Sequence, residues 1–411
     1  IPLSRSQPDD HLAKKVAQRW KYEKQAAEIS ILTTTQSKKE KAFLSNLAIA
    51  LSRQWAPARV IDSTQLEKAD EWEAFLSAAQ LQIILANDHE LWRMKKLMQW
   101  LSQFKGNEFH FEVVGDILTP EILNFLETVP PGMFQFEIGI QTTTESVQET
   151  IKRKQSNQKL FATIQRLVEQ DRIHFHCDLI FGLPGETLEH IKESFCQVMA
   201  LRPHELQLGF LKFLPGAPIN NLVEKHQYRY QSTPPYELIS HQELSAKEVL
   251  YLKQFVDIFD RYYNSKRFRF SINTLLEKMD PVALFDYLLE YHDSHALLMN
   301  PVSLDEHYRI FRDTFYPDPT PMEQDLLKLD YLYSQRSFRL PGILSTKPPA
   351  KTWKKDRKTP IIPFDHEIEI SGSQALLKEA KHPVYYAIAH SQNGDGYFRR
   401  PTVNAISEPE A

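Results

Sequence analysis

Residues 134–184 read FQFEIGIQTTTESVQETIKRKQSNQKLFATIQRLVEQDRIHFHCDLIFGLP, and this stretch decides the fold. Its apolar runs FQFEIGIQ and RIHFHCDLIFG predict two strands, and the periodicity between them predicts a connecting helix. Gln141 ends the first strand, Arg153 follows it within the connection, and Asp178 stands in the second strand. Parallel α/β folds gather their ligand-binding groups at such strand ends. We therefore expect a binding site here.

The same alternation of strands and helices extends from Glu28 to Phe213. Helices are predicted near residues 38–54, 67–79 and 90–104. The seven predicted strands are ISILTTT, RVIDS, QIILAND, FHFEVV, FQFEIGIQ, RIHFHCDLIFG and ELQLGFLKF. This order predicts βαβ units with a parallel sheet, which either a partial (β/α) barrel or a doubly wound sheet would satisfy.

The character of the chain changes beyond Pro215. Apolar residues at helical spacing from Ser245 to Ser334 predict four helices, and a Pro- and Lys-rich stretch from Leu340 predicts an extended arm. A short strand, VYYAIAH, and a polar tail follow. The predicted divisions are a linker over 1–28, an α/β domain over 29–216, a helical domain over 217–340, and an arm and tail over 341–411.

Composition favours a folded, soluble, cytoplasmic protein. The 411 residues are 42% hydrophobic, and 49 Lys and Arg nearly balance 53 Asp and Glu, so the net charge indicates neither nucleic acid nor membrane as a partner. No apolar run is long enough for a membrane span or a signal peptide. Two cysteines argue against a disulfide scaffold and offer no CxxC pair for zinc.

Carboxylates inside apolar strands are costly unless they meet a cation or several donors, so Glu112 and Glu137 are candidate site residues. Pairing with a nearby Lys or Arg, or exposure to solvent, would equally explain each of them. Asp178 opens DLIFGLP, where Gly182 permits a close approach of the backbone. A helix cap is the alternative role for Asp178, but the next helix is predicted to begin only near Thr187.

His174 and His176 alternate on one strand face, with Cys177 on the other. Two histidines and an acid could ligate a metal, but no third ligand is apparent in the sequence. A histidine pair on a sheet face is the favoured interpretation. No metal ligand and no catalytic residue is therefore predicted.

The joint spacing of Glu112, Gln141, Arg153 and Asp178 resembles the cofactor site of radical S-adenosylmethionine enzymes. That resemblance implies a partial barrel in which the glutamate binds the methionine amino group, the arginine binds its carboxylate, and the glutamine and aspartate bind the ribose. The resemblance assigns four further residues to the same cofactor site, with the last two flanking adenine: Ile180, Gly182, Phe210 and Leu211.

Longer motifs, among them PPGMFQFEIGIQTTTES and HFHCDLIFGLPGET, resemble the cobalamin-type branch of that family with a helical carboxy-terminal extension. Residues 1–28 resemble the linker that follows a cobalamin-binding domain, which implies cobalamin only if such a domain lies upstream. The family also implies a [4Fe–4S] cluster on a CxxxCxxC loop.

The sequence departs from the family at that loop. The stretch 22–46 that should carry it has neither cysteine nor histidine, Cys177 lies on a later strand and Cys196 lies in a helix. Three hypotheses follow: a pseudoenzyme that binds the cofactor, a fragment or divergent member of an active cobalamin-dependent enzyme, and an interaction protein on an inert barrel that uses the basic arm KTWKKDRK. The sequence does not identify a substrate.

Overall fold

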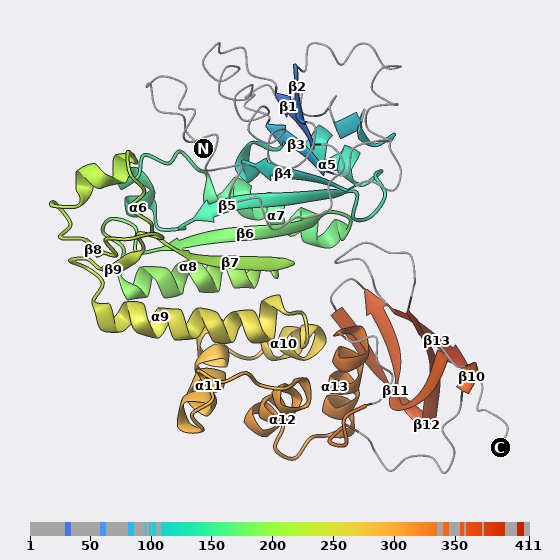
Figure 1. Ribbon diagram of the computed structural model, residues 1–411. Helices are drawn as coiled ribbons and strands as arrows, with labels where there is room; N and C mark the ends of the chain where they lie inside the picture. Colours follow the sequence, from blue (N-terminus) through green and yellow to red (C-terminus); the bar gives the residue numbers. More distant parts are fainter. Residues whose placement is uncertain are drawn as a thin grey trace. The chain divides into compact units, whose positions relative to one another are not determined.

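The computed structural model describes residues 108–334 without a break (Figure 1). It also describes 29–33, 58–62, 81–85, 340–344, 354–356, 359–371, 374–390 and 401–406, with a few positions between 95 and 103. The helices predicted near 38–54 and 67–79 lie outside these residues, and the one near 90–104 lies mostly outside them. The chain divides into two compact units, 1–111 with 118–135 and 112–117 with 136–411, and the division passes through two strands of one sheet.

All seven predicted strands are present, but they are distributed between two sheets. β1 (Ile29–Thr33) pairs in parallel with β2 (Ala58–Asp62) and with β3 (Leu81–Leu85), in the order β2-β1-β3. The second sheet has the order β4-β5-β6-β7, with β4 at Phe109–Val113, β5 at Phe134–Gln141, β6 at His174–Phe181 and β7 at Glu205–Phe210. Its strands run in the same direction (Figure 1).

Side chains alternate strictly across the β4–β7 sheet because successive residues of a strand point to opposite faces. Phe136, Ile138 and Leu179 are among the fully buried residues of one face. The other face is polar and more open, and it carries Glu112 and Glu137. One face of the sheet therefore builds the core while the other is available for ligands.

Helices follow the strands. Short α5 (Pro120–Leu126) precedes β5, and α6 (Glu145–Thr150) and α7 (Asn157–Gln170) connect β5 to β6. Both α5 and α7 have a side-chain cap at their start. α8 (Leu188–Ala200) begins with a capping box in which the Thr187 side chain accepts from the His190 N–H. The prediction that this helix begins near Thr187 is confirmed, so Asp178 does not cap it.

The helical region contains one helix more than predicted. α9 (Ala246–Phe259) runs into a π-helical turn, η4 (Asp260–Asn264), and α10 (Arg269–Leu275), α11 (Pro281–Ser294) and α12 (Leu304–Phe315) follow. The additional helix is α13 (Pro321–Ser334), which is buried continuously over residues 325–332. A helix buried all round lacks the one-sided apolar stripe that sequence periodicity detects.

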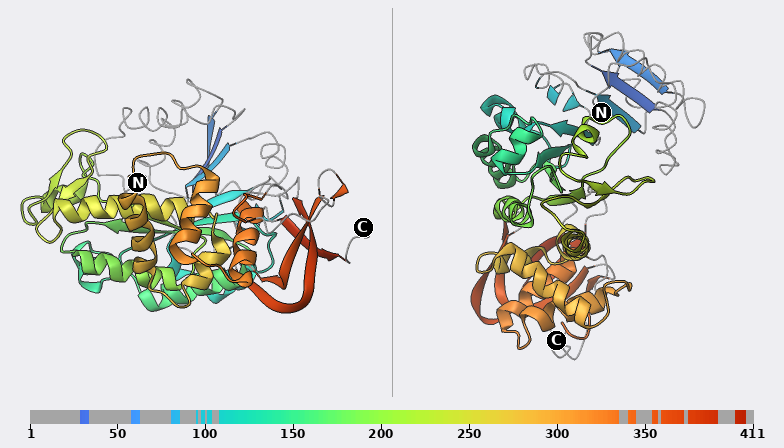
Figure 2. Two further views of the ribbon diagram at one scale, coloured as in Figure 1. Left: turned by 90° about the horizontal axis from the view of Figure 1, so that it is seen from below. Right: turned by 90° about the vertical axis from the view of Figure 1, so that its left-hand side faces the viewer.

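The carboxy-terminal region forms a sheet, in which the predicted strand VYYAIAH is the second half of β12 and further strands occupy parts of the predicted arm and tail. β10 (Lys354–Asp356), β11 (Thr359–Ser371), β12 (Gln374–His390) and β13 (Pro401–Ile406) pair antiparallel in chain order. Figure 2 shows this sheet in red beside the orange α13. Phe364 of β11 and Tyr386 of β12 share a buried cluster with Phe270 of α10 and Leu329 of α13. Apolar packing on one face explains why the strands form despite their polar composition.

α13 also holds its neighbours through buried acids. Asp330 accepts hydrogen bonds from the Phe270 N–H (2.7 Å) and the Ser271 N–H (3.0 Å) of α10. Asp325 pairs with Lys328 (2.9 Å) and accepts from the N–H groups of Asp365 (2.7 Å) and His366 (3.1 Å) of β11. Buried charges with this many partners are tolerated, whereas removal of one partner is costly.

Short β8 (Arg229–Tyr230) and β9 (Leu238–Ser240) pair antiparallel between the sheet and the helical region. Within the part of the chain that the structure describes, no helix is both long and apolar enough to cross a membrane.

A buried histidine predicts a pH dependence of stability. Burial, and to a smaller extent Arg267 and His292, lower the pKa of His307 to about 4. The neutral ring suits the fold, whereas the unfolded chain binds a proton below about pH 6.5, so stability decreases as the pH falls from about 6.5 to about 4. Between about pH 7.5 and 5 this loss is about 2 kcal/mol, and His307→Phe, which keeps a ring against Tyr262, should remove it.

Urea unfolding at both pH values measures this loss, with His295→Phe as the control because His295 is exposed. The attribution to His307 is wrong if the two variants show the same pH dependence.

Candidate functional site

The polar face of the β4–β7 sheet carries three carboxylates, those of Glu112, Glu137 and Asp178. Burial raises the pKa of Asp178 to about 7, and the charges of Glu137 and then Glu112 contribute to that rise. Oδ1 of Asp178 is buried and has no hydrogen-bond partner among the described residues. A buried acceptor of this kind costs free energy until a donor reaches it. The site therefore offers a place for a ligand hydroxyl or a cation.

Gln141 and Arg153 lie together at the end of β5. A Cβ atom added at Gly139 would lie 3.8 Å from Nη2 of Arg153 and 3.9 Å from Nε2 of Gln141. Both side chains therefore approach the same glycine. Arg153 donates from Nη2 to the Gly139 carbonyl and from Nε to Oε1 of Gln155 (2.8 Å). Burial lowers the pKa of its guanidinium, but an arginine stays charged. The structure thus brings together the two residues that the sequence separates by a helix.

A buried polar network fixes the chain behind Gln141, whose φ of 68° is unusual for a residue with a side chain. The Thr143 N–H donates to Oγ of Ser194 (3.1 Å), and Nε2 of Gln148 donates to the Thr142 carbonyl (2.8 Å). Nδ2 of Asn157 donates to the Thr143 carbonyl (2.7 Å). Sequence analysis missed this network, because isolated Thr, Ser and Gln residues give no pattern.

The buried side chain of Glu186 holds the turn after β6 through hydrogen bonds to its backbone. Oε2 of Glu186 accepts from the N–H groups of Gly182 (2.9 Å) and Leu183 (3.2 Å), and burial raises the pKa of Glu186 to about 8. The hydroxyl of Tyr228 donates to the Gly182 carbonyl (3.0 Å). Gly182 has φ of +84°, which favours glycine. Its N–H and its carbonyl both have hydrogen-bond partners, so its position is closely defined.

Of the remaining predicted cofactor residues, Ile180 is half-buried and follows Asp178 along the same face of β6. Phe210 ends β7, with Nζ of Lys253 lying 5.4 Å from the centre of its ring. The N–H of Leu211 donates to the Phe181 carbonyl (3.0 Å), and its carbonyl accepts from the Leu238 N–H (3.0 Å). The amide of Leu211 is therefore already committed within the protein.

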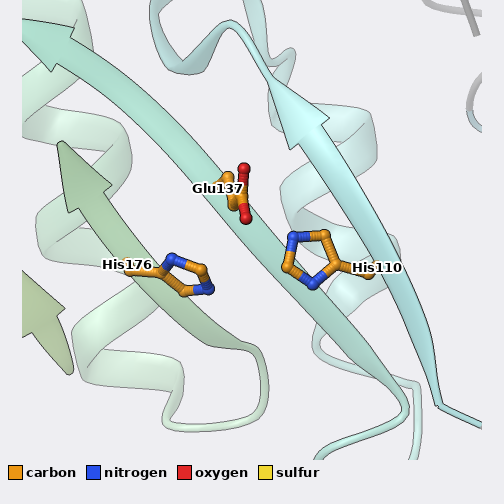
Figure 3. Close-up of side chains that lie close together, drawn as sticks. All are labelled: His110, Glu137 and His176. Carbon is orange, nitrogen blue, oxygen red and sulfur yellow. The ribbon is translucent and has the colours of Figure 1, made fainter. Parts of the chain in front are cut away.

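A set of possible metal ligands was not expected from the sequence. Figure 3 shows Glu137 of β5 and His176 of β6 directed into the same space, and His110 of β4 completes a set whose ligand atoms all lie within 4.8 Å of one another. Nδ1 of His176 lies 3.2 Å from Nε2 of Gln207 on β7. His174, by contrast, pairs with Glu205 (3.1 Å). The ring centres of His174 and His176 lie 6.0 Å apart, so the predicted histidine pair on the sheet face is present, although the two histidines have different polar partners.

The cysteines are not arranged to bind a cluster. Cys177 is fully buried on the apolar face of β6, and burial raises the pKa of its thiol well above the usual value. Cys196 on α8 donates to Asp280 (3.4 Å), and burial raises its pKa to about 11. Both are thiols at neutral pH, and the 411 residues contain no other cysteine.

The turn after β6 yields a matched pair of glycine substitutions. A Cβ at Gly182 would come within 2.0 Å of the Leu238 side chain, whereas a Cβ at Gly185, with φ of +81°, would meet nothing within 4 Å. Gly185→Ala should cost only the backbone strain, about 1 kcal/mol. Gly182→Ala adds a steric conflict and should cost about 2–4 kcal/mol in urea unfolding. Equal losses for the two variants would show that Leu238 does not constrain the turn.

Two family models match the chain. Residues 67–195 match the model described as "Radical SAM superfamily", and residues 224–363 match one described as "Protein of unknown function (DUF4080)". The heme chaperone HemW of Bacillus subtilis is 28% identical over 166 residues, which are 39% of this chain and 41% of HemW. The oxygen-independent coproporphyrinogen III oxidase of Escherichia coli is 27% identical over 130 residues, 31% of this chain and 28% of that enzyme.

A third curated relative is the cobalamin-dependent radical SAM methyltransferase TokK of Streptomyces tokunonensis, 30% identical over 98 residues, which are 24% of this chain and 14% of TokK. The matches to these relatives span less than half of their lengths. Among solved structures, coproporphyrinogen III oxidase from Escherichia coli matches with 16% identity and a TM-score of 0.30, covering 60% of this chain and 61% of that one. Such a TM-score is too low to establish a shared fold by superposition. The two matches thus assign residues 67–195 to the radical SAM superfamily and residues 224–363 to a DUF4080 region.

Proposed function

We propose that this protein binds S-adenosylmethionine at the carboxyl ends of β5, β6 and β7 and does not carry the [4Fe–4S] cluster of its superfamily. The observation that carries the proposal is the buried Oδ1 of Asp178, which has no partner among the described residues. A carboxylate at the end of a strand commonly accepts hydrogen bonds from ribose hydroxyls. The residues present therefore fit the nucleoside half of this cofactor.

The charged groups of the methionine half of the cofactor would meet side chains of opposite charge. Arg153 uses two of its donors on Gly139 and Gln155, and the planar guanidinium retains others for the methionine carboxylate. Glu112 would take the methionine amino group, and Gln141 would share the ribose with Asp178. The sulfonium of the cofactor would also be attracted by the carboxylates that face Asp178.

Adenine recognition would depend on side chains more than on backbone. Leu211 has no free N–H for the base, because that group donates to Phe181. Ile180 and Phe210 can pack against the ring, and the φ of Gly182 lets the backbone approach closely. In this proposal Leu211 flanks the base without supplying an amide hydrogen bond.

The iron–sulfur cluster does not fit the residues present. When bound in this superfamily it supplies the electron that cleaves the sulfonium, and its irons require thiolate ligands. Cys177 and Cys196 are buried or hydrogen-bonded thiols on different elements, and no third cysteine exists in this sequence. The proposal is therefore binding without radical chemistry. An active cobalamin-dependent enzyme is the competing hypothesis, favoured by the match to TokK.

Isothermal titration with S-adenosylmethionine tests the binding site. Wild type should bind saturably, and Asp178→Ala and Arg153→Ala should each weaken binding at least about tenfold, the equivalent of about 1.4 kcal/mol. Asp293→Asn on the exposed side of α11 is the control and should bind like wild type. No saturable binding by wild type, or equal binding by all variants, would refute the proposal.

Anaerobic reconstitution with iron and sulfide tests the absence of the cluster. We expect no acid-labile sulfide on the protein and no broad absorbance near about 400 nm. Stoichiometric sulfide with that absorbance would instead support the active enzyme. Sulfide is the decisive quantity, because iron alone could bind to nitrogen and oxygen ligands.

A further inference from the structure

The polar face of the β4–β7 sheet has features that cofactor binding does not explain. His176 is almost wholly buried, although it belongs to the face that carries the carboxylates. Glu137 approaches it from the neighbouring strand, with a carboxylate oxygen within 4.8 Å of a ring nitrogen (Figure 3). His176 has no role in the proposed contacts with S-adenosylmethionine, and Glu137 would contribute only its charge, without a hydrogen bond to the cofactor.

We infer that Glu137 and His176 bind a divalent transition-metal ion on this face, with His110 as the third protein ligand. Two imidazoles and one carboxylate form a ligand set that suits Fe²⁺, Mn²⁺, Co²⁺ or Zn²⁺ and leaves coordination positions open. The ligand atoms of the set already lie within 4.8 Å of one another, so small side-chain movements would bring all of them onto one ion. Nitrogen and oxygen ligands make this a site without thiolates.

A neighbouring side chain, Gln207, lies within hydrogen-bond distance of His176. Gln207 on β7 contacts Nδ1 of the ring at 3.2 Å, which leaves Nε2 as the nitrogen directed away from β7. The atom of Gln207 that faces the ring is its amide nitrogen, which donates to Nδ1 and leaves the proton on Nε2. Metal binding would therefore require the amide to turn over, so that its oxygen accepts from the Nδ1–H and Nε2 is free to ligate. Outer partners of this kind typically change metal affinity by about 10–100-fold.

The charge around the set also favours a cation. Glu112 lies on the same strand face as His110, two residues further along β4, and Asp178 lies two residues beyond His176 on β6. A divalent ion here would place positive charge among three carboxylates, those of Glu112, Glu137 and Asp178.

Equilibrium titration of the chelator-treated full chain with Co²⁺ tests the site, because bound Co²⁺ has visible absorption bands that report nitrogen and oxygen ligands. Wild type should bind one Co²⁺ per chain. Glu137→Gln and His176→Ala should each weaken binding at least about tenfold, and Gln207→Ala should weaken it by about tenfold. His110→Ala should behave like the other ligand substitutions.

The matched control is His174→Ala. His174 lies on the same strand and the same face, two residues before His176, but it pairs with Glu205. This variant should bind Co²⁺ like wild type. The inference is refuted if wild type binds no Co²⁺, or if His174→Ala weakens binding as much as His176→Ala. Circular dichroism of each variant separates loss of a ligand from loss of folding.

The metal site and the proposed cofactor site can be tested separately. S-adenosylmethionine binding depends on Asp178 and Arg153, whereas Co²⁺ binding depends on Glu137 and His176. Loss of cofactor binding in Arg153→Ala with Co²⁺ binding retained would separate the two. A wild type that binds cofactor but no Co²⁺ would remove the metal inference alone.

Discussion

The strict alternation of side chains across the β4–β7 sheet is the constraint on which the rest of this structure depends. Residues such as Phe136, Ile138 and Leu179 are fully buried on one face, at about 25 cal/mol for each Å² of apolar surface removed from water. Because the strand period is two, the same backbone places Glu137 and Asp178 on the opposite face. A slip of one residue in register would bury these carboxylates and expose the core. Apolar packing thus determines where the polar site lies.

Much of the fold follows from the sequence, for identifiable reasons. The strands of the α/β region were predicted because short apolar runs alternate with helical segments, and the helix start at Thr187 has a recognisable capping residue. α13 was missed because it is buried on every side, with Asp325, Lys328 and Asp330 where an apolar stripe would be expected. The strand VYYAIAH within β12 was predicted, but the rest of the carboxy-terminal sheet was missed because the Pro and Lys content before it is typical of loops and the sheet packs on α10 and α13.

The candidate site was only partly predictable. The spacing of Gln141, Arg153 and Asp178 was informative because a parallel sheet brings strand ends together, and the shared approach of Gln141 and Arg153 to Gly139 agrees with it. His110, Glu137 and His176 stand on three different strands, and no local pattern connects them. The structure also changes the role expected of Leu211, because its N–H donates to the Phe181 carbonyl and is not available to adenine. Contacts between distant residues are what the sequence could not supply.

The buried acids of α13 have a consequence for how this chain can be divided into fragments. The DUF4080 match ends at residue 363, inside β11, yet the backbone donors that satisfy Asp325 belong to Asp365 and His366. A fragment cut at the end of the match would leave that carboxylate without two of its donors in a nonpolar interior. The smallest autonomous piece of the helical region must therefore include β11, together with the β12 strand that covers it. The natural boundary of this region lies beyond the one that sequence similarity marks.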